Sequence, residues 1–524
     1  MKKIYLFAAL AITVVQAQAQ DGVNLDTYMG AQVAIEDLNG TARYVGMGGA
    51  MEALGADISV MGSNPAGIGL FRKSQVSGSF GLVSQGDGKS FQDGAKTNAS
   101  FDQLGIVFAT RAGVHSYLNF GFNYHKSRNF NYVLSAANDA VNGSSLNRQV
   151  YIKAATGLLD TYNGATQLDQ LIDDAFQDDM GNFYVNGGSY QMDRAHTGYI
   201  GEYDFNLSGN INNRVYLGMT VGLKDVHYNG YSEYVEHLAS DDPALQYMKT
   251  TDDQHITGTG FNVKAGIIVR PVEDSPFRIG ASVSSPTWYK LRNENYTALY
   301  DRDGQINNIS YNVKFRFDTP WVFGLSLGHT IDNRIALGAT YEYADYTTND
   351  MRSIDDAYYD YWDDYYHENS SSDQVMKRHT ERTLSGVSTL KLGAECKIDK
   401  TVAVRVGYNY VAPMYKESGV RDQTLDSPGT YMASTADYTN WKSTNRLTAG
   451  VGFTIDKFRL DLAYQYSMRS GDFYPFMQGD PDNPSQPFST VDPADGVTRL
   501  SNSCQPTSVK DNRHQLLCTM TYTF

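Results

Sequence analysis

The residues whose spacing most resembles a catalytic motif are Gly324-Leu325-Ser326-Leu327-Gly328, which match the G-x-S-x-G pattern of serine hydrolases. In those enzymes the serine is a nucleophile held on a sharp turn between a strand and a helix. Here Ser326 lies inside a run of alternating apolar and polar residues, and no helical pattern follows it. We therefore expect Ser326 to be an ordinary strand residue and the protein not to be an enzyme.

The segment 355–368 is rich in Asp and Tyr and is the second candidate for chemistry. Several neighbouring carboxylates suit a hard divalent cation, and the tyrosines suit a landing surface for an apolar ligand. The spacing lacks the glycine turn and terminal glutamate of an EF-hand loop. We favour a solvated acidic extracellular loop with tyrosines near the lipid headgroups, and we predict neither a metal site nor a cofactor.

Other reactive residues are sparse. Cys396, Cys504 and Cys518 are too few for a disulfide framework, although one pair could form. Ten histidines are scattered singly, which gives no basis for a haem or zinc pair. The 58 acidic and 43 basic side chains give a formal charge of −15, which makes a nucleic-acid partner unlikely because phosphate recognition needs a basic surface.

The elements that would carry these residues are strands with one apolar face. Residues 458–467 illustrate the pattern, because Phe458, Leu460 and Leu462 alternate with polar or small neighbours. About fourteen such runs are present, an even number as bacterial outer-membrane barrels require. They fall near 74–84, 98–111, 114–129, 195–210, 213–229, 255–270, 276–292, 307–328, 333–347, 379–398, 401–415, 442–456, 457–470 and 510–524.

The connections between these runs alternate between short and long. Tight links such as Ile211-Asn212 and Ile398-Asp399-Lys400 separate long polar segments near 85–97, 130–194, 230–254, 293–306, 348–378, 416–441 and 471–509. Outer-membrane barrels have short periplasmic turns and long extracellular loops, whereas a soluble β-sandwich has no reason for this order. We predict an all-β membrane protein whose barrel spans 74–524 and ends on the aromatic Phe524.

The first nineteen residues have the pattern of a secretory signal peptide. Lys2 and Lys3 precede an apolar run over 4–15, and small residues Ala17 and Ala19 stand at the positions that a signal peptidase reads. We expect cleavage after Ala19. No Cys follows that site, so a lipoprotein anchor is not indicated. The mean hydropathy of −0.42 is compatible with a barrel, because polar alternate residues and long loops dilute the apolar wall.

Residues 20–73 do not alternate. They include the Gly-rich run 44–55 and then 57–67, a composition that predicts short helices and turns rather than strands. A barrel of about fourteen strands encloses more space than its own side chains fill. We therefore predict an N-terminal plug inside the lumen.

At this point three motifs support a family resemblance. Gly-Met-Gly-Gly-Ala at 46–50, Ser-Asn-Pro-Ala-Gly at 63–67 and Thr319-Pro320-Trp321 resemble elements of the FadL-type outer-membrane transport family. The resemblance implies a protein of the bacterial outer membrane that carries long-chain fatty acids or aromatic hydrocarbons. It also implies capture at the outer surface, movement to a site near the start of the plug, and lateral escape where a strand kinks inward.

The resemblance assigns a few site residues. Asn64, Pro65 and Ala66 match the family's plug motif, where they act in the gate or simply close a turn. Gly121 falls where the inward kink of the third strand would lie, because glycine permits a bulge. Pro320 marks either a break in the wall or a strand start, since proline cannot donate to the ladder.

Together these observations predict a monomeric channel for passive uptake of a hydrophobic small molecule. Its other partners would be outer-membrane lipid and lipopolysaccharide. The alternative is a barrel of the same fold that does not transport and instead serves a secretion system or surface assembly. Co-purification with protein partners would favour that alternative, and a bound apolar molecule would favour the channel.

Overall fold

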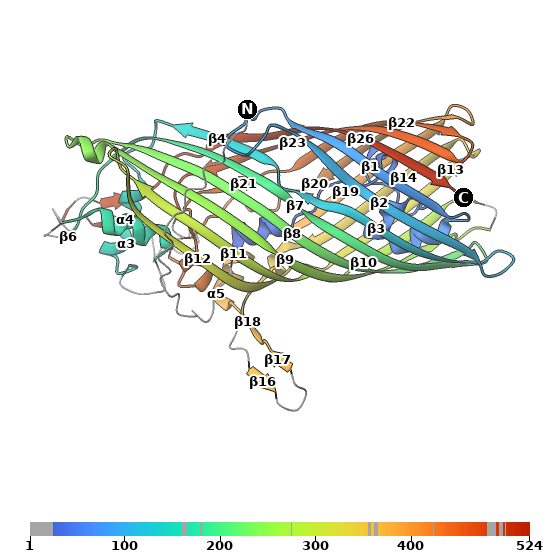
Figure 1. Cartoon of the computed structure of the whole chain (residues 1–524), viewed down its shortest axis with the longest axis horizontal. Coiled ribbons are helices and arrows are strands. Elements are labelled where there is room, and N and C mark those ends of the chain that lie inside the picture. The colour runs from blue at the N-terminus through green and yellow to red at the C-terminus, as the bar shows by residue number, and fades with distance from the viewer. Residues whose placement is uncertain are drawn as a thin grey trace, which may run out of the picture.

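The computed structural model describes residues 25–159, 165–178, 181–273, 275–354, 358–360, 365–422, 424–478, 489–491, 496–497 and 499–524. Fourteen antiparallel wall strands close into a barrel, as predicted (Figure 1). Closure is made by β26 (Thr507–Thr523) and β1 (Gln75–Gln85), which pair from Gln75 with Thr523 to Gln85 with Arg513. A closed wall leaves no unpaired sheet edge.

The wall strands follow one another in chain order around the ring, and five of them are built from two pieces. They are β1, β2 (Thr97–Arg111), β3 (Tyr117–Asn129) with β4 (Tyr132–Asn138), β7 (Gly187–Ile211), β8 (Val215–Leu238), β9 (Tyr247–Val269), β10 (Arg278–Ser284) with β11 (Trp288–Tyr300), β12 (Gln305–Asp318) with β13 (Val322–Ile331), β14 (Ile335–Asp345) with β15 (Asp350–Ile354), β19 (Gly386–Lys397), β20 (Val402–Val411), β21 (Tyr438–Trp441) with β22 (Thr444–Ile455), β23 (Phe458–Tyr474) and β26.

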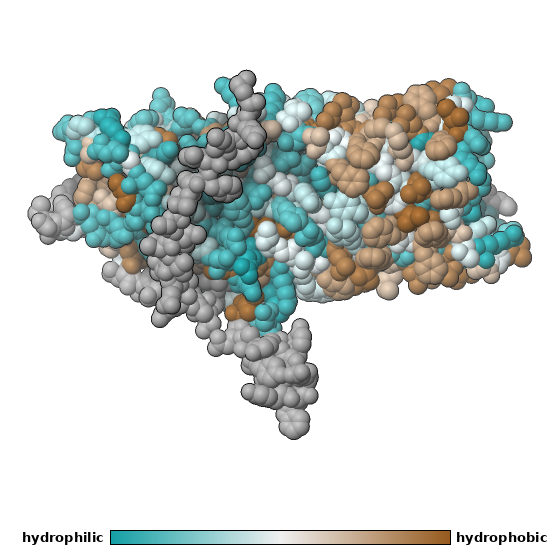
Figure 2. All heavy atoms as spheres, viewed as in Figure 1, coloured by the Kyte–Doolittle hydropathy of each residue, from teal (hydrophilic) through white to brown (hydrophobic). Residues whose placement is uncertain are grey.

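The predicted short links lie together at one end of the barrel, here called the short-turn end. The turns at Asn212-Asn213 and Asp332-Asn333 have φ values between +50° and +54°, as tight hairpin turns of the right twist require. Large apolar side chains gather on the outer surface of this half, whereas the other half is hydrophilic (Figure 2). The exposed apolar side chains of this belt include Phe80, Leu118, Phe205, Leu217, Phe323, Leu325 and Leu516.

Several wall strands are longer than predicted. The strands β7, β8 and β9 have 25, 24 and 23 residues and extend far into 130–194 and 230–254, and β11 extends to Tyr300 in 293–306. All three segments were predicted as loops. That prediction was wrong because the outer faces of these extensions are polar, for example at Gln191 of β7 and Glu233 of β8. A strand outside a bilayer has no apolar face toward lipid, so its alternation is not visible as hydropathy.

One strand start was also wrong. The run predicted as a strand from 379 begins instead with helix α5 (Gln374–Thr383), and β19 starts at Gly386. Asp373 caps this helix by accepting hydrogen bonds from the backbone N–H groups of Val375 and Met376. Such a cap satisfies donors that a strand would have to pair elsewhere.

The N-terminal segment, defined as residues 25–73, contacts opposite sides of the wall. It contains α1 (Thr27–Ala34), α2 (Ala42–Gly46), η1 (Ile58–Gly62) and η2 (Pro65–Leu70). The η2 helix packs on β7, β8 and β9, whereas α2 packs on β20, β22, β23 and β26. Its side chains are mostly buried, so the segment is part of the interior and not a surface loop.

Short elements lie between the wall strands. They are α3 (Leu146–Ala155), α4 (Gln167–Ala175), α5, α6 (Pro428–Tyr431), η3 (Pro243–Gln246), η4 (Tyr346–Thr348) and the short strands β5 (Gln177–Asp178), β6 (Gly181–Asn182), β16 (Tyr358–Asp360), β17 (Tyr365–His367), β18 (Ser370–Ser372), β24 (Ser489–Val491) and β25 (Arg499–Ser501). Those around α3 and α4 form a head at the long-loop end, whereas β16, β17 and β18 project from the side of the barrel (Figure 1). A buried apolar cluster that includes Leu146, Ile172, Tyr190 and Phe473 holds α3 and α4 onto the wall. No helix in these ranges is long and apolar enough to cross a bilayer.

Candidate functional site

Ser326 is a strand residue, as expected. It lies in the middle of β13, where it pairs with Gly280 on β10 and with Thr340 on β14. The strand continues to Ile331 and then turns into another strand, so the elbow that a serine nucleophile needs is absent here. Residues 355–357 and 361–364 of the acidic segment 355–368 lie outside the described residues. Cys396, Cys504 and Cys518 are all free thiols.

The predicted Asn-Pro-Ala motif begins the η2 helix. The Asn64 side-chain oxygen accepts a hydrogen bond from the Ala66 N–H at 3.2 Å, and Pro65 occupies the first turn, where its missing N–H costs nothing. The Ser208 hydroxyl of β7 donates to the Pro65 carbonyl at 2.8 Å. Asn64 is fully buried. The motif is therefore both a helix cap and a contact with the wall.

Glycines of the wall face the N-terminal segment at close range, four of them its backbone and Gly266 the side chain of Asn64. A Cβ atom at any of these positions would lie closer than 3.0 Å to residues 47–65, which real Cβ atoms essentially never do. We call these glycines the glycine collar. Its members are Gly218, Gly266, Gly338, Gly393 and Gly407. Glycine weakens a strand and marks close approach of another backbone, so the sequence carried this signal at inward positions of alternating runs.

Ion pairs add to this contact. Asp37 pairs with Arg128 of β3 at 2.9 Å, and Arg43 pairs with Glu395 of β19 at 2.9 Å. Two further pairs join Glu36 to Lys224 of β8 and Glu52 to Lys391 of β19. All of the wall partners are largely buried, so removing one charge would leave the other uncompensated.

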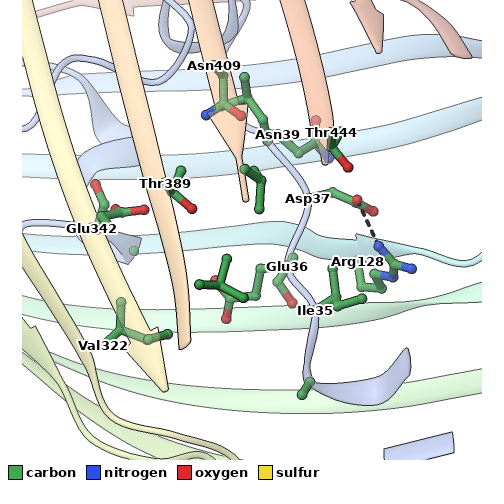
Figure 3. A pocket seen from close by; sticks show the side chains of 18 of the residues that line it. Ile35, Glu36, Asp37, Asn39, Arg128, Val322, Glu342, Thr389, Asn409 and Thr444 are labelled. Carbon is green, nitrogen blue, oxygen red and sulfur yellow. Dashed lines mark hydrogen bonds and ion pairs between the residues drawn. The ribbon is translucent and has the colours of Figure 1, made fainter. Parts of the chain in front are cut away.

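An internal cavity of about 280 Å³ is lined by the chain from Ala34 to Asn39 and by residues of α2 and η1 (Figure 3). The end of α1 and the chain around Asp37 cross it, and polar side chains of the wall such as Thr389 and Asn409 point into it. A smaller cavity of about 90 Å³ lies next to it toward the head. The two cavities share six lining residues, which are Ile35, Arg128, Tyr415, Trp441, Arg469 and Arg513.

The wall beside the larger cavity is interrupted. Three neighbouring wall strands each break, at 285–287, at 319–321 and at 346–349, and these residues are here called the wall interruption. Pro320 lies in it, between β12 and β13, and Pro286 lies in the neighbouring break. Few hydrogen bonds join the strands here, among them Thr319 N–H to the Thr287 carbonyl at 3.2 Å and Thr287 N–H to the Thr319 hydroxyl at 2.8 Å.

The two faces of the wall interruption differ. Ser285, Thr287, Thr319, Pro320 and Tyr346 line the larger cavity on the inner side. On the outer side, Trp288 and Trp321 are 43% and 51% exposed. Tryptophan prefers the boundary between lipid tails and headgroups. The interruption thus connects a polar cavity with an aromatic rim.

Gly121 lies in β3, outside the wall interruption. It pairs with Val107 of β2 and Asn206 of β7, and neither ladder shifts register at that point. A Cβ atom there would collide with the Met61 side chain of η1. The register of β3 shifts later, between Lys126 and Arg128. Gly121 therefore serves a close contact with the N-terminal segment, and its role as the site of a wall kink stays a prediction.

No family model and no curated protein matches this sequence. Among solved structures, a Pseudomonas aeruginosa FadL homologue matches with 13% identity and a TM-score of 0.52, over 94% of this chain and 100% of that one. The P. putida toluene transporter TodX matches with 14% identity and a TM-score of 0.48, over 93% and 99% of the chains. The Ralstonia pickettii toluene transporter TbuX matches with 12% identity and a TM-score of 0.47, over 93% of this chain and 99% of that one. At such low identity the likeness to the P. aeruginosa protein shows the fold alone, and by that measure this chain has the FadL-type barrel fold.

Proposed function

We propose that this protein is a bacterial outer-membrane channel through which a hydrophobic molecule enters by diffusion. The observation that carries the proposal is the larger cavity, which lies between a filled short-turn end and an interrupted wall. The apolar belt of the outer surface supports a place in a membrane. On this proposal the short-turn end faces the periplasm, and residues 1–19 are a cleaved signal peptide.

In this channel the N-terminal segment is the plug. The glycine collar brings the backbones of segment and wall into direct contact, and buried ion pairs such as Arg43 with Glu395 hold them together. Moving the segment as one body would break these contacts at once. A molecule in the larger cavity therefore has no open path along the barrel axis past residues 42–70.

The remaining exit is sideways, through the wall interruption. Only a few hydrogen bonds close it, because Pro286 and Pro320 have no N–H to donate. The exit opens at the aromatic rim of Trp288 and Trp321, where an apolar molecule passes directly into lipid. Neither the gate role of Asn64, Pro65 and Ala66 nor any movement of the plug is needed for this route.

A reversible cross-link tests the route. Thr287→Cys combined with Thr319→Cys, in a chain whose three native cysteines are replaced by Ser, places two thiols on facing residues of the interruption. Oxidation should lower uptake of labelled long-chain fatty acid or toluene by cells that lack other channels. A reductant should restore it.

The control pair is Leu447→Cys with Tyr466→Cys, which face each other on the outer surface of the uninterrupted ladder of β22 and β23. Its oxidation should leave uptake unchanged. If both pairs oxidise fully and neither alters uptake, the lateral route is wrong. If no variant and no native chain supports uptake, while protein partners co-purify in fixed ratio, the protein is a scaffold and not a channel.

A further inference from the structure

Four arginines from four wall strands meet between the two cavities. Arg128 of β3 and Arg446 of β22 both face one oxygen of Asp37, at 2.9 and 3.9 Å. Arg469 of β23 and Arg513 of β26 both face Asp511, at 2.9 and 2.8 Å. The two groups are joined, because Arg513 donates to the Asn129 carbonyl at 3.3 Å and the Asn129 N–H donates to Asp37 at 2.9 Å. We call these six charged residues the arginine cluster.

The arginine cluster has more positive than negative charge. Four guanidinium groups face two carboxylates, and the arginine side chains are between 9% and 14% exposed. Burial raises the pKa of Asp37, but the guanidiniums of Arg128, Arg513 and Arg446 outweigh this and lower it below its ordinary value. Asp37 is therefore already ionised, and its charge is fully counted in the balance.

Other charged residues of the larger cavity have partners of opposite charge, Lys126 reaching Asp102 through the Ser100 hydroxyl. Lys264 pairs with Glu202 at 2.6 Å, and Lys391 pairs with Glu342 at 2.5 Å. The excess of positive charge is therefore local to the arginine cluster. Buried charges are costly unless they are paired, and Arg128 Nε has no hydrogen-bond partner among the described residues. One arginine beside Asp37 would be enough to hold the N-terminal segment in place. That role explains neither the excess positive charge of the arginine cluster nor the Nε of Arg128 that lacks a described partner.

Aromatic side chains surround the arginine cluster on the side of the head. Arg469 lies over the Trp441 ring at 4.1 Å, and Arg513 lies over the Tyr132 ring at 5.8 Å. The smaller cavity continues from there between further aromatic rings, including those of Tyr28, Tyr228, Tyr415 and Tyr438. Tyr28 and Tyr415 stack with ring centres 5.3 Å apart. Charged side chains also line this cavity, but four of them are paired, Arg194 with Asp437 and Arg421 with Asp26. An apolar group next to the arginine cluster would contact the aromatic rings.

We propose that the arginine cluster binds a doubly charged oxyanion, such as a phosphate monoester, and that the part of the ligand's apolar chain next to this group lies against the aromatic rings of the smaller cavity. Guanidinium forks suit phosphate oxygens better than a single point charge does. Two negative charges cancel the excess of the cluster, whereas a monocarboxylate leaves half of it and a neutral hydrocarbon leaves all. The inference rests on the proposed function for passage of the ligand, and it narrows the ligand to hydrophobic molecules with a dianionic group.

Binding to the full-length protein in a neutral detergent tests this inference without transport. Dodecyl phosphate, dodecanoate and inorganic phosphate are compared by calorimetry at pH 8.5, where a phosphate monoester carries two charges. Trp441 supplies a second readout, because a ligand at Arg469 should change its fluorescence. We expect dodecyl phosphate to bind about 10-fold or more tightly than dodecanoate, as one additional charged hydrogen bond allows.

Arg446→Gln and Arg513→Gln should each weaken binding of dodecyl phosphate by about 10-fold or more. Arg513→Lys keeps the charge but loses the fork, so its binding should be intermediate. The control is Arg292→Gln, whose side chain is 42% exposed on the outer surface of β11. Heat-dependent migration on a gel checks that each barrel has folded, and only folded variants are compared.

Equal binding of dodecyl phosphate and dodecanoate, unaffected by the cluster variants, would overturn the proposal. Inorganic phosphate that binds as tightly as dodecyl phosphate would keep the anion site but refute the apolar subsite. The oxidised Thr287→Cys and Thr319→Cys chain separates this inference from the proposed function. If it still binds dodecyl phosphate while the native chain shows no uptake, the channel fails and the anion site stands.

Discussion

The Asp37 carboxylate accepts a hydrogen bond from the Arg128 guanidinium at 2.9 Å, and this pair ties the N-terminal segment to β3 inside the larger cavity (Figure 3). Asp37 also accepts from the Asn129 N–H at 2.9 Å. One carboxylate thus fixes the segment, the end of a wall strand and half of the arginine cluster. Its removal should affect both stability and anion binding.

Asp37→Asn should lower the unfolding temperature, because Arg128 and Arg446 would lose their counter-charge in a buried site. Removing one partner of a buried pair costs about 3–5 kcal/mol, and less where water reaches it as it does at Asp37. Thermal unfolding in detergent measures this change. Added phosphate should restore part of the loss, whereas Asp301→Asn in an exposed turn should unfold like the native chain.

Replacing a glycine of the collar with a larger residue should displace the N-terminal segment from the wall. A leucine at Gly338 would collide with the Ala50 carbonyl, and no flexible side chain is available there to move aside. We expect Gly338→Leu to raise ion conductance in planar bilayers, since the filled short-turn end would open. Gly78→Leu on the outer surface is the control, because its nearest neighbour is the Leu104 side chain at 3.7 Å. Equal conductance of the two variants would contradict a seal at the collar.

The head should loosen at alkaline pH through Glu236, at the end of β8 beyond the apolar belt. Burial raises the pKa of this carboxyl to about 8, although hydrogen bonds from Tyr234 and Leu146 lower it. Since the folded state binds this proton more tightly, its stabilising effect is complete below about 4.5 and is lost as the pH rises through about 8. Limited proteolysis around α3 should therefore be faster at pH 9 than at pH 6. Glu236→Gln should abolish the difference.

Restoring hydrogen-bond donors in the wall interruption should reduce uptake. Alanine at both Pro286 and Pro320 supplies two N–H groups and relaxes the constraint on φ, so the broken strands can pair more continuously. We expect slower uptake by the double variant at an equal amount of protein in the membrane. Pro243→Ala, at the start of η3 in the head, is the matched control. Unchanged uptake in the double variant would show that prolines do not keep the interruption open.

The barrel wall could be predicted from the sequence because hydropathy alternates locally. The runs around 458–467 and 402–410 carry their apolar faces in every second residue, and the turns between them carry Asn and Asp. The same reasoning failed for the parts of β7, β8 and β9 that extend beyond the apolar belt, where the outward face is polar. The prediction of a strand also failed at α5, where the Asp373 side chain caps and stabilises a helix.

The sequence by itself determined the number of wall strands, the order of short and long connections except at 301–304, and a compact segment ahead of the first strand. Only the tertiary structure decided what meets inside. Arg128 and Arg513 are 385 residues apart, and closure of the barrel between β26 and β1 brings them to one cavity. Pro286 and Pro320 form one interruption because their strands pair in a particular register. Periodicity is a local property of the chain, whereas register and closure depend on the whole ring.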